Sequence, residues 1–85
     1  MPSEKTARSA ERKRLRNRRI RTTARTIVTR ANNVLQRGQL QDAEPAVAHA
    51  IKMLDGAVTK GIIHRNNAAR KKSRLMAKLN ALKAS

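Results

Sequence analysis

The side chains that could do chemistry in this chain are almost all cationic. Its 85 residues include 21 Lys and Arg against five Asp and Glu, which gives a net charge of +16. The acids form no pair at general acid–base spacing, and there is neither a Gly-rich loop nor a nucleophile beside a base. The absence of cysteine excludes thiolate and disulfide chemistry. The sequence therefore predicts a binding protein rather than an enzyme, with no cofactor, no metal and no small-molecule substrate.

A charge of this size indicates the class of partner. Excess positive charge attracts polyanions, so nucleic acid is the leading partner and an anionic membrane surface the second. Proteins that read single-stranded RNA usually stack bases on aromatic rings, and this chain has no Phe, Tyr or Trp. The composition therefore favours folded or double-helical nucleic acid, bound through its backbone. Residues 1–19 offer only Leu15 beyond Met1 as bulky apolar groups, which argues against a membrane-surface helix or a mitochondrial presequence.

The cations fall in two stretches that are far apart in the sequence. In residues 5–25 only Glu11 opposes them, and residues 60–80 contain no acid. Soluble surfaces normally mix both signs, so unopposed cations indicate a nucleic-acid-binding surface rather than a solvated helix face. The predicted contacts are these cations and the polar side chains beside them: Lys5, Arg8, Arg12, Lys13, Arg14, Arg16, Asn17, Arg18, Arg19, Arg21, Arg25, His64, Arg65, Asn66, Arg70, Lys71, Lys72, Ser73, Arg74 and Lys78.

His64 and its neighbours allow more than one interpretation. His64 could bind a metal, contact nucleic acid or precede a helix cap. A metal is disfavoured because the only other histidine is His49 and no carboxylate lies at ligand spacing, so a nucleic-acid contact is preferred. Asn66 or Asn67 is expected to cap the next helix, because an Asn side chain accepts a hydrogen bond from the first turn. Ser73 either contacts phosphate or is solvated.

Three helices are expected to position these side chains. Residues 3–37 contain neither Gly nor Pro and are predicted to form one long helix capped by Ser3, with Gly38 just past its end. Apolar residues recur at helical spacing only from Ile20 onward. The predicted core stripe of this helix consists of Ile20, Ala24, Ile27, Val28, Ala31, Val34 and Leu35.

The second and third helices are each expected to be about 17 residues long. Asp42 is the predicted N-cap of the second helix, which places Pro45 in its first turn, and Gly61 follows its end. Close packing of helices is one explanation for Gly56 inside it. The third helix covers roughly residues 68–83. The predicted core positions are Val47, Ala50, Ile51, Leu54 and Val58, followed by Ala68, Leu75, Leu79 and Leu82.

Helix lengths predict an all-α, three-helix bundle with up-down-up topology. The first helix is about twice as long as the others. Within a single domain, residues 1–85, we therefore expect residues 1–19 to overhang as a basic extension and residues 20–85 to form the bundle. The extension should fray until an anionic partner binds, because burial barely offsets chain entropy in so small a protein. The topology also brings the basic start of the third helix next to Arg18, Arg19, Arg21 and Arg25.

Two blocks of sequence resemble a known family. The first comprises residues 11–18, ERKRLRNR, and residues 21–26, RTTART; the second comprises residues 60–75, KGIIHRNNAARKKSRL. Together they closely resemble the S-twenty family of bacterial small-subunit ribosomal proteins, over roughly residues 5–82. The resemblance implies a three-helix bundle that binds ribosomal RNA directly and early in small-subunit assembly. It implies a place at the foot of the particle, between the 5′ domain and the long penultimate RNA helix, with few protein contacts.

Location and alternatives follow from the same observations. The resemblance implies a cytoplasmic protein of the small ribosomal subunit, with an organelle as the other setting. No run of the sequence approaches the roughly 20 apolar residues of a membrane span, and no signal-peptide core follows Met1. The rival function is that of a nucleoid-type architectural DNA binder, which would use the same charges without selecting RNA.

Overall fold

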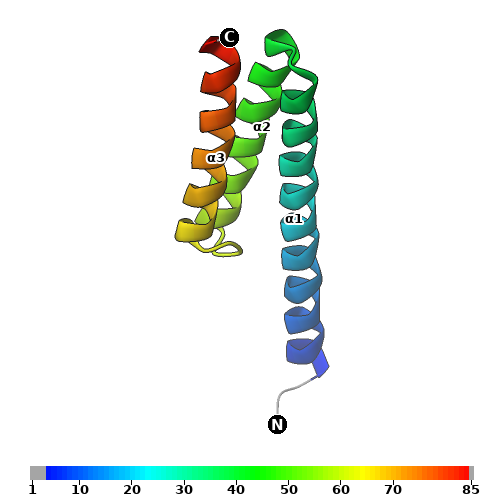
Figure 1. Cartoon of the computed structure of the whole chain (residues 1–85). Coiled ribbons are helices and arrows are strands. Elements are labelled where there is room, and N and C mark those ends of the chain that lie inside the picture. Colours follow the sequence, from blue (N-terminus) through cyan, green and yellow to red (C-terminus); the bar gives the residue numbers. More distant parts are fainter. Residues whose placement is uncertain (1–3, 85) are drawn as a thin grey trace.

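The computed structural model describes residues 4–84, and the side chains of residues 7–84, as three α-helices. They are α1 (Glu4–Arg37), α2 (Leu40–Thr59) and α3 (Arg65–Ala84). The helices run up, down and up, with the two short connections at opposite ends (Figure 1). The predicted all-α, three-helix bundle is therefore confirmed. The cap expected at Ser3 lies outside the described residues.

Glycine ends the first two helices, as the sequence predicts. Gly38 and Gly61 have φ angles of 77° and 74°, in the left-handed region that glycine adopts without steric cost. After α2, the N–H of Gly61 donates to the carbonyl of Val58 and the N–H of Ile62 donates to the carbonyl of Ala57, both at 2.9 Å. This pair of bonds is the Schellman motif, and it turns the chain sharply into α3.

The start of α2 differs from the prediction. The helix begins at Leu40 with Gln39 in the N-cap position, and no side chain caps it. The carbonyl of Gln39 already accepts a hydrogen bond from the N–H of Asp42 at 3.1 Å, and Leu40 packs against the core. The first turn therefore winds before Asp42, and the predicted cap there is wrong. Pro45 consequently lies in the second turn, where its missing N–H costs a helical hydrogen bond.

The core lies along α2, which packs extensively against both other helices, whereas α1 and α3 touch each other much less. Alanine supplies more than half of the buried residues, so the helices approach closely but bury little area per residue. The predicted stripes are confirmed, because their remaining members are half-buried and all of them except Ile20 pack against the core cluster. The buried residues are Ala24, Ala31, Leu35, Ala43, Val47, Ala50, Leu54, Ala57, Ala68, Leu75 and Leu79.

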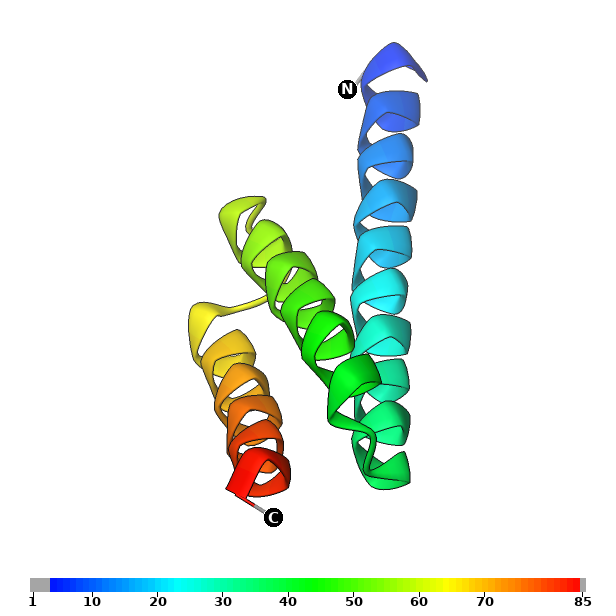
Figure 2. The same ribbon diagram turned by 90° about the horizontal axis from the view of Figure 1, so that it is seen from above.

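The first part of α1 has nothing to pack against. Residues 7–16 are all exposed, Ile20 is half-buried, and Ala24 is the first fully buried residue among residues 7–37. In both ribbon views α1 extends past the turn that joins α2 to α3 (Figures 1 and 2). We call residues 7–19 the free half of α1 and residues 20–37 its packed half.

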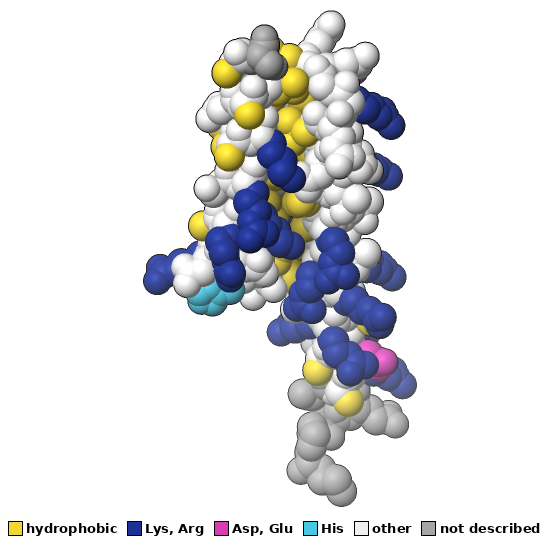
Figure 3. Space-filling model, in the orientation of Figure 1, with side chains coloured by type: hydrophobic (Ala, Val, Ile, Leu, Met, Phe, Trp, Pro, Cys, Tyr) yellow, Lys and Arg dark blue, Asp and Glu magenta, His cyan; other side chains and the backbone are white. Residues whose placement is uncertain are grey.

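A groove separates α1 from α3. The two helices lie on opposite sides of α2 (Figure 2), and the residues lining the hollows between them come from both. Apolar side chains form the floor of this groove, and Lys and Arg side chains stand on both sides of its lower part (Figure 3). The groove and the free half are therefore two surfaces on which cations gather.

Candidate nucleic-acid interface

The free half of α1 presents unneutralised charge. Its Arg and Lys side chains are exposed, and none forms an ion pair with another described side chain. Because they recur at every angle around the helix, no side of the free half is neutral. Asn17 is half-buried, and the side chain of Lys5 lies outside the described residues. The exposed cations of the free half are Arg8, Arg12, Lys13, Arg14, Arg16, Arg18 and Arg19.

The two basic stretches of the sequence meet at the lower end of the groove. Arg21 and Arg25 of α1 line one hollow, of about 160 Å³, together with His64, Asn67 and Lys71 at the start of α3. We call this the cationic hollow. Residues about 40 to 50 positions apart in the sequence thus share one site, because the short turn after α2 folds α3 back alongside α1. The predicted convergence is confirmed for Arg21 and Arg25.

Arg18 and Arg19 do not line the cationic hollow. They line a separate, shallow depression with Leu15, Thr22 and Thr23 on α1 itself. The free half and the cationic hollow are therefore neighbouring surfaces, and Arg18 and Arg19 belong to the first.

His64 caps α3. Its Nδ1 atom accepts a hydrogen bond from the backbone N–H of Asn66 at 3.1 Å, and its carbonyl accepts one from the N–H of Ala68 at 3.1 Å. These are the two bonds that an N-cap residue makes. The helix therefore begins at Arg65, and the prediction that Asn66 or Asn67 caps it is wrong.

Packing against the core explains why His64, rather than Asn66 or Asn67, is the N-cap of α3. Ile63, the residue before the cap, packs against the core cluster to which Ala68 belongs. A hydrophobic contact between the residue before a cap and the fourth helical residue fixes how the chain enters a helix. Because His64 makes the cap bond, the exposed side-chain amides of Asn66 and Asn67 are left to face solvent or a partner. Histidine is not among the favoured cap residues, so the sequence carried no clear signal for it.

Two predicted contact residues have partners inside the protein. Lys72 pairs with Asp55 of α2 at 2.7 Å, so much of its charge is offset before any ligand arrives. Lys78 donates a hydrogen bond to Asn32 Oδ1 of α1 at 2.8 Å. This bond crosses the groove, and because Asn32 is neutral, it adds no opposing charge beside Lys78.

The remaining candidates on α3 divide between two sides of the helix. Lys71, Arg74 and Lys78 recur at three- and four-residue spacing and so share the side that borders the groove. Arg70 and Ser73 are exposed on the outer side, and Arg65 is exposed at the helix start. Figure 3 shows the cations of α3 and those of α1 facing each other across the lower groove.

Charge is segregated between the helices. Asp42, Glu44 and Asp55 all lie on α2, and the described residues of α3 include no acid. Facing cationic rows repel each other, so an anion placed between them gains favourable interactions with both.

Among the described residues, no three His, Cys, Asp or Glu side chains cluster closely enough to hold a metal ion. None of the three described helices has the length and hydropathy of a membrane span.

Fold and surface together define a small, all-helical, strongly cationic protein in which most of the described acids lie on α2 and the exposed charge of α1 and α3 is almost entirely positive. Comparison with known families agrees. The chain belongs to the ribosomal protein S20 family, which it matches over residues 2–80. It is therefore a ribosomal protein, structural rather than enzymatic, and the family resemblance predicted from its sequence is confirmed.

Individual relatives cover nearly the whole chain. A protein of Thermomicrobium roseum named small ribosomal subunit protein bS20 is 49% identical, over 96% of this chain and 87% of the relative. Proteins of the same name from Natranaerobius thermophilus and Dehalococcoides mccartyi are 42% and 45% identical, each over 92% of this chain and 89% of the relative. The similarity thus includes both the free half of α1 and the cationic hollow.

Proposed function

We propose that this protein is a constituent of the small ribosomal subunit in the bacterial cytoplasm and binds small-subunit ribosomal RNA directly. It supports assembly by neutralising phosphates where RNA helices pack together. Relatives named as small-subunit proteins support the location. The observation that carries the RNA-binding proposal is the cationic hollow, where Arg21 and Arg25 of α1 meet Lys71 of α3 with no described acid between them.

The proposed mechanism is electrostatic. Lys and Arg side chains pair with phosphate oxygens and release condensed counterions, so affinity falls steeply as salt rises. Specificity comes from RNA shape and from 2′-hydroxyl contacts, to which Asn17, His64 and Asn66 contribute hydrogen-bonding groups. Nε2 of His64 is the ring nitrogen available for this, since Nδ1 already accepts the cap hydrogen bond.

The free half and the groove have separate tasks in this proposal. A helix with cations on every side can lie between two RNA helices and touch both, because each side meets a different phosphate backbone. We assign the free half to such a gap, between the 5′ domain and the long penultimate helix. The cationic hollow then anchors the bundle on one of these RNA helices.

Competition binding tests the function. The full chain is bound to transcribed small-subunit ribosomal RNA at physiological salt with excess transfer RNA, in parallel with duplex DNA of equal length. We expect saturable, competitor-resistant binding to the ribosomal RNA alone. Equal retention of RNA and DNA, both lost to the competitor, would instead support an architectural DNA binder that reads only charge.

The same assay tests residues of α3. Arg70→Ala and Arg74→Ala should each weaken RNA binding and reduce the slope of log affinity against log salt by about 0.7 to 0.9 for each phosphate that is no longer neutralised. Lys52→Ala, at an exposed cation on α2, is the matched control and should change neither quantity. Unchanged affinity and slope in both arginine variants would refute their role.

A further inference from the structure

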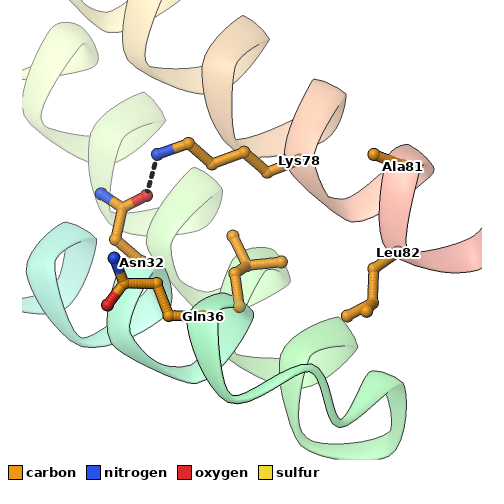
Figure 4. A pocket seen from close by; sticks show the side chains of 6 residues that line it. Asn32, Gln36, Lys78, Ala81 and Leu82 are labelled. Carbon is orange, nitrogen blue, oxygen red and sulfur yellow. Dashed lines mark hydrogen bonds between the residues drawn. The ribbon is translucent and has the colours of Figure 1, made fainter.

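A second hollow lies at the upper end of the groove and differs in chemistry from the cationic hollow. Asn32, Leu35 and Gln36 of α1 line one side, and Lys78, Ala81 and Leu82 of α3 line the other (Figure 4). Its volume is about 440 Å³, within the range of small-ligand pockets. We call it the amide hollow, because Asn32 and Gln36 bring their side-chain amides to it.

The polar groups of the amide hollow are few, and a hydrogen bond holds two of the three in place. Asn32 and Gln36 are one helical turn apart and so lie on the same side of α1. The 2.8 Å bond from Lys78 to Asn32 Oδ1 (Figure 4) orients both side chains across the groove. It leaves the Asn32 amide N–H groups and the other Lys78 N–H groups as donors. The exposed Gln36 amide hydrogen-bonds to no other side chain within residues 7–84.

This set of groups matches the parts of a nucleotide. A side-chain amide offers an acceptor beside a donor, which is the complement of the edge of a base, and of adenine in particular. The Lys78 ammonium suits a phosphate, and the aliphatic side chains of Leu35 and Leu82 suit the flat face of a base. In an RNA duplex the Watson–Crick edges are paired, and the major groove is too deep and narrow for side chains to read the base edges there, so only an unpaired, unstacked base presents its Watson–Crick edge to such a site.

We propose that the amide hollow binds one unpaired nucleotide of the ribosomal RNA, with adenine preferred. The Gln36 amide pairs with the base edge, the Asn32 amide N–H donates to the same base, and Lys78 contacts its phosphate. This inference rests on the proposed function and extends it, because it adds base recognition to a chain that otherwise contacts the RNA backbone. It also gives the upper groove, where cations are sparse, a ligand of its own.

Chemical probing of the complex tests the inference. The full chain is bound to transcribed small-subunit ribosomal RNA and probed with dimethyl sulfate, which reports accessible adenine and cytosine base edges. Hydroxyl radicals report the backbone in parallel. The variants are Gln36→Ala and Asn32→Ala. Their matched controls are Gln41→Ala on α2 and Asn33→Ala, the exposed neighbour of Asn32. Circular dichroism establishes that each variant is folded.

The expected result is a loss of base protection in the two variants while the protein still binds the RNA backbone. Wild-type protein should protect one or two adjacent bases that Gln36→Ala and Asn32→Ala leave reactive, while Gln41→Ala and Asn33→Ala still protect them. Affinity should fall about tenfold in the first pair, as expected when one amide–base pair is removed, with backbone protection kept. If the backbone is protected but base reactivity is identical in the wild type and all variants, the hollow binds no base. That result would overturn this inference and leave the proposed function standing; another protein covering the hollow would give the same result. Absence of backbone protection by the wild type would overturn the proposed function as well.

Discussion

The two halves of α1 have the same backbone and opposite surroundings. The packed half contributes Ala24, Ala31 and Leu35 to the core, whereas the free half buries no residue. Isolated helices in water are marginal without tertiary contacts. A helix that runs for more than three turns before its first buried residue, Ala24, is therefore not explained by the stability of the bundle. The difference indicates that the packed half specifies the fold, and it supports the proposal that the free half serves RNA binding.

The largest effect should come from a core truncation in the bundle. Leu54 is 1% exposed at the centre of the core and Leu15 is 45% exposed on the free half. Leu54→Ala should lower the free energy of unfolding by about 2 to 5 kcal/mol, comparable to the whole stability of so small a core. Leu15→Ala should change it by less than about 0.5 kcal/mol. Thermal unfolding followed by circular dichroism measures both, and equal destabilisation would break the comparison.

Removing charge should affect RNA binding more in the free half of α1 than in the packed half, the reverse of the pattern expected for stability. Arg12→Gln with Arg14→Gln keeps helix propensity and should weaken ribosomal RNA binding about tenfold, with a shallower salt dependence. The unfolding temperature should not fall. The control pair, Arg30→Gln with Arg37→Gln, removes the same charge from exposed positions of the packed half and should affect binding less. Equal losses in the two pairs would show that net charge alone matters.

The His64 cap allows a finer distinction between fold and partner. His64→Ala should cost about 1 kcal/mol of stability, because the N–H of Asn66 loses its acceptor. His64→Asn should retain most of the stability, since Asn is a favoured cap. If His64 also contacts RNA, both variants will lose affinity in the binding assay. Loss of affinity in His64→Ala alone would assign the residue to the cap only.

The smallest expected effect is a gain in stability. Gly56 lies inside α2, and a Cβ built there meets no atom within 4 Å, so close helix packing does not explain this glycine. Gly56→Ala should raise the free energy of unfolding by about 0.5 to 1 kcal/mol, because alanine loses less backbone entropy in a helix. Chemical denaturation measures the change, and a loss of stability would mean that α2 packs differently at this point.

The sequence predicted helix ends and core positions better than helix starts. Gly38 and Gly61 are strong local signals, because their backbone geometry needs no tertiary information, and apolar spacing identified the buried sides of all three helices. The starts at Leu40 and Arg65 were missed. There, packing of Leu40 and Ile63 on the core outweighed the local preference for Asp42 and Asn66 as caps.

The candidate site was predictable in composition and only partly in geometry. The facing of Arg21 and Arg25 toward the start of α3 followed from helix lengths and short turns. The pairs Lys72–Asp55 and Lys78–Asn32 depend on how each helix is rotated about its axis, which periodicity alone does not fix. The amide hollow was not foreseen for the same reason, since Asn32 and Gln36 acquire a role only opposite Lys78. The RNA contacts of individual residues and the fraying of the N-terminal extension stay predictions.

Because the free half does not pack on the bundle, its length can change in evolution independently of the core. Deleting or adding two helical turns, about seven residues, before residue 17 would change its reach by about 10 Å and leave the packing of the core as it is. Seven residues also nearly restore the rotational phase of the helix, so the remaining cations would keep their directions. Selection can thus adjust the length of the helix to a changing RNA without a compensating change in the three-helix core.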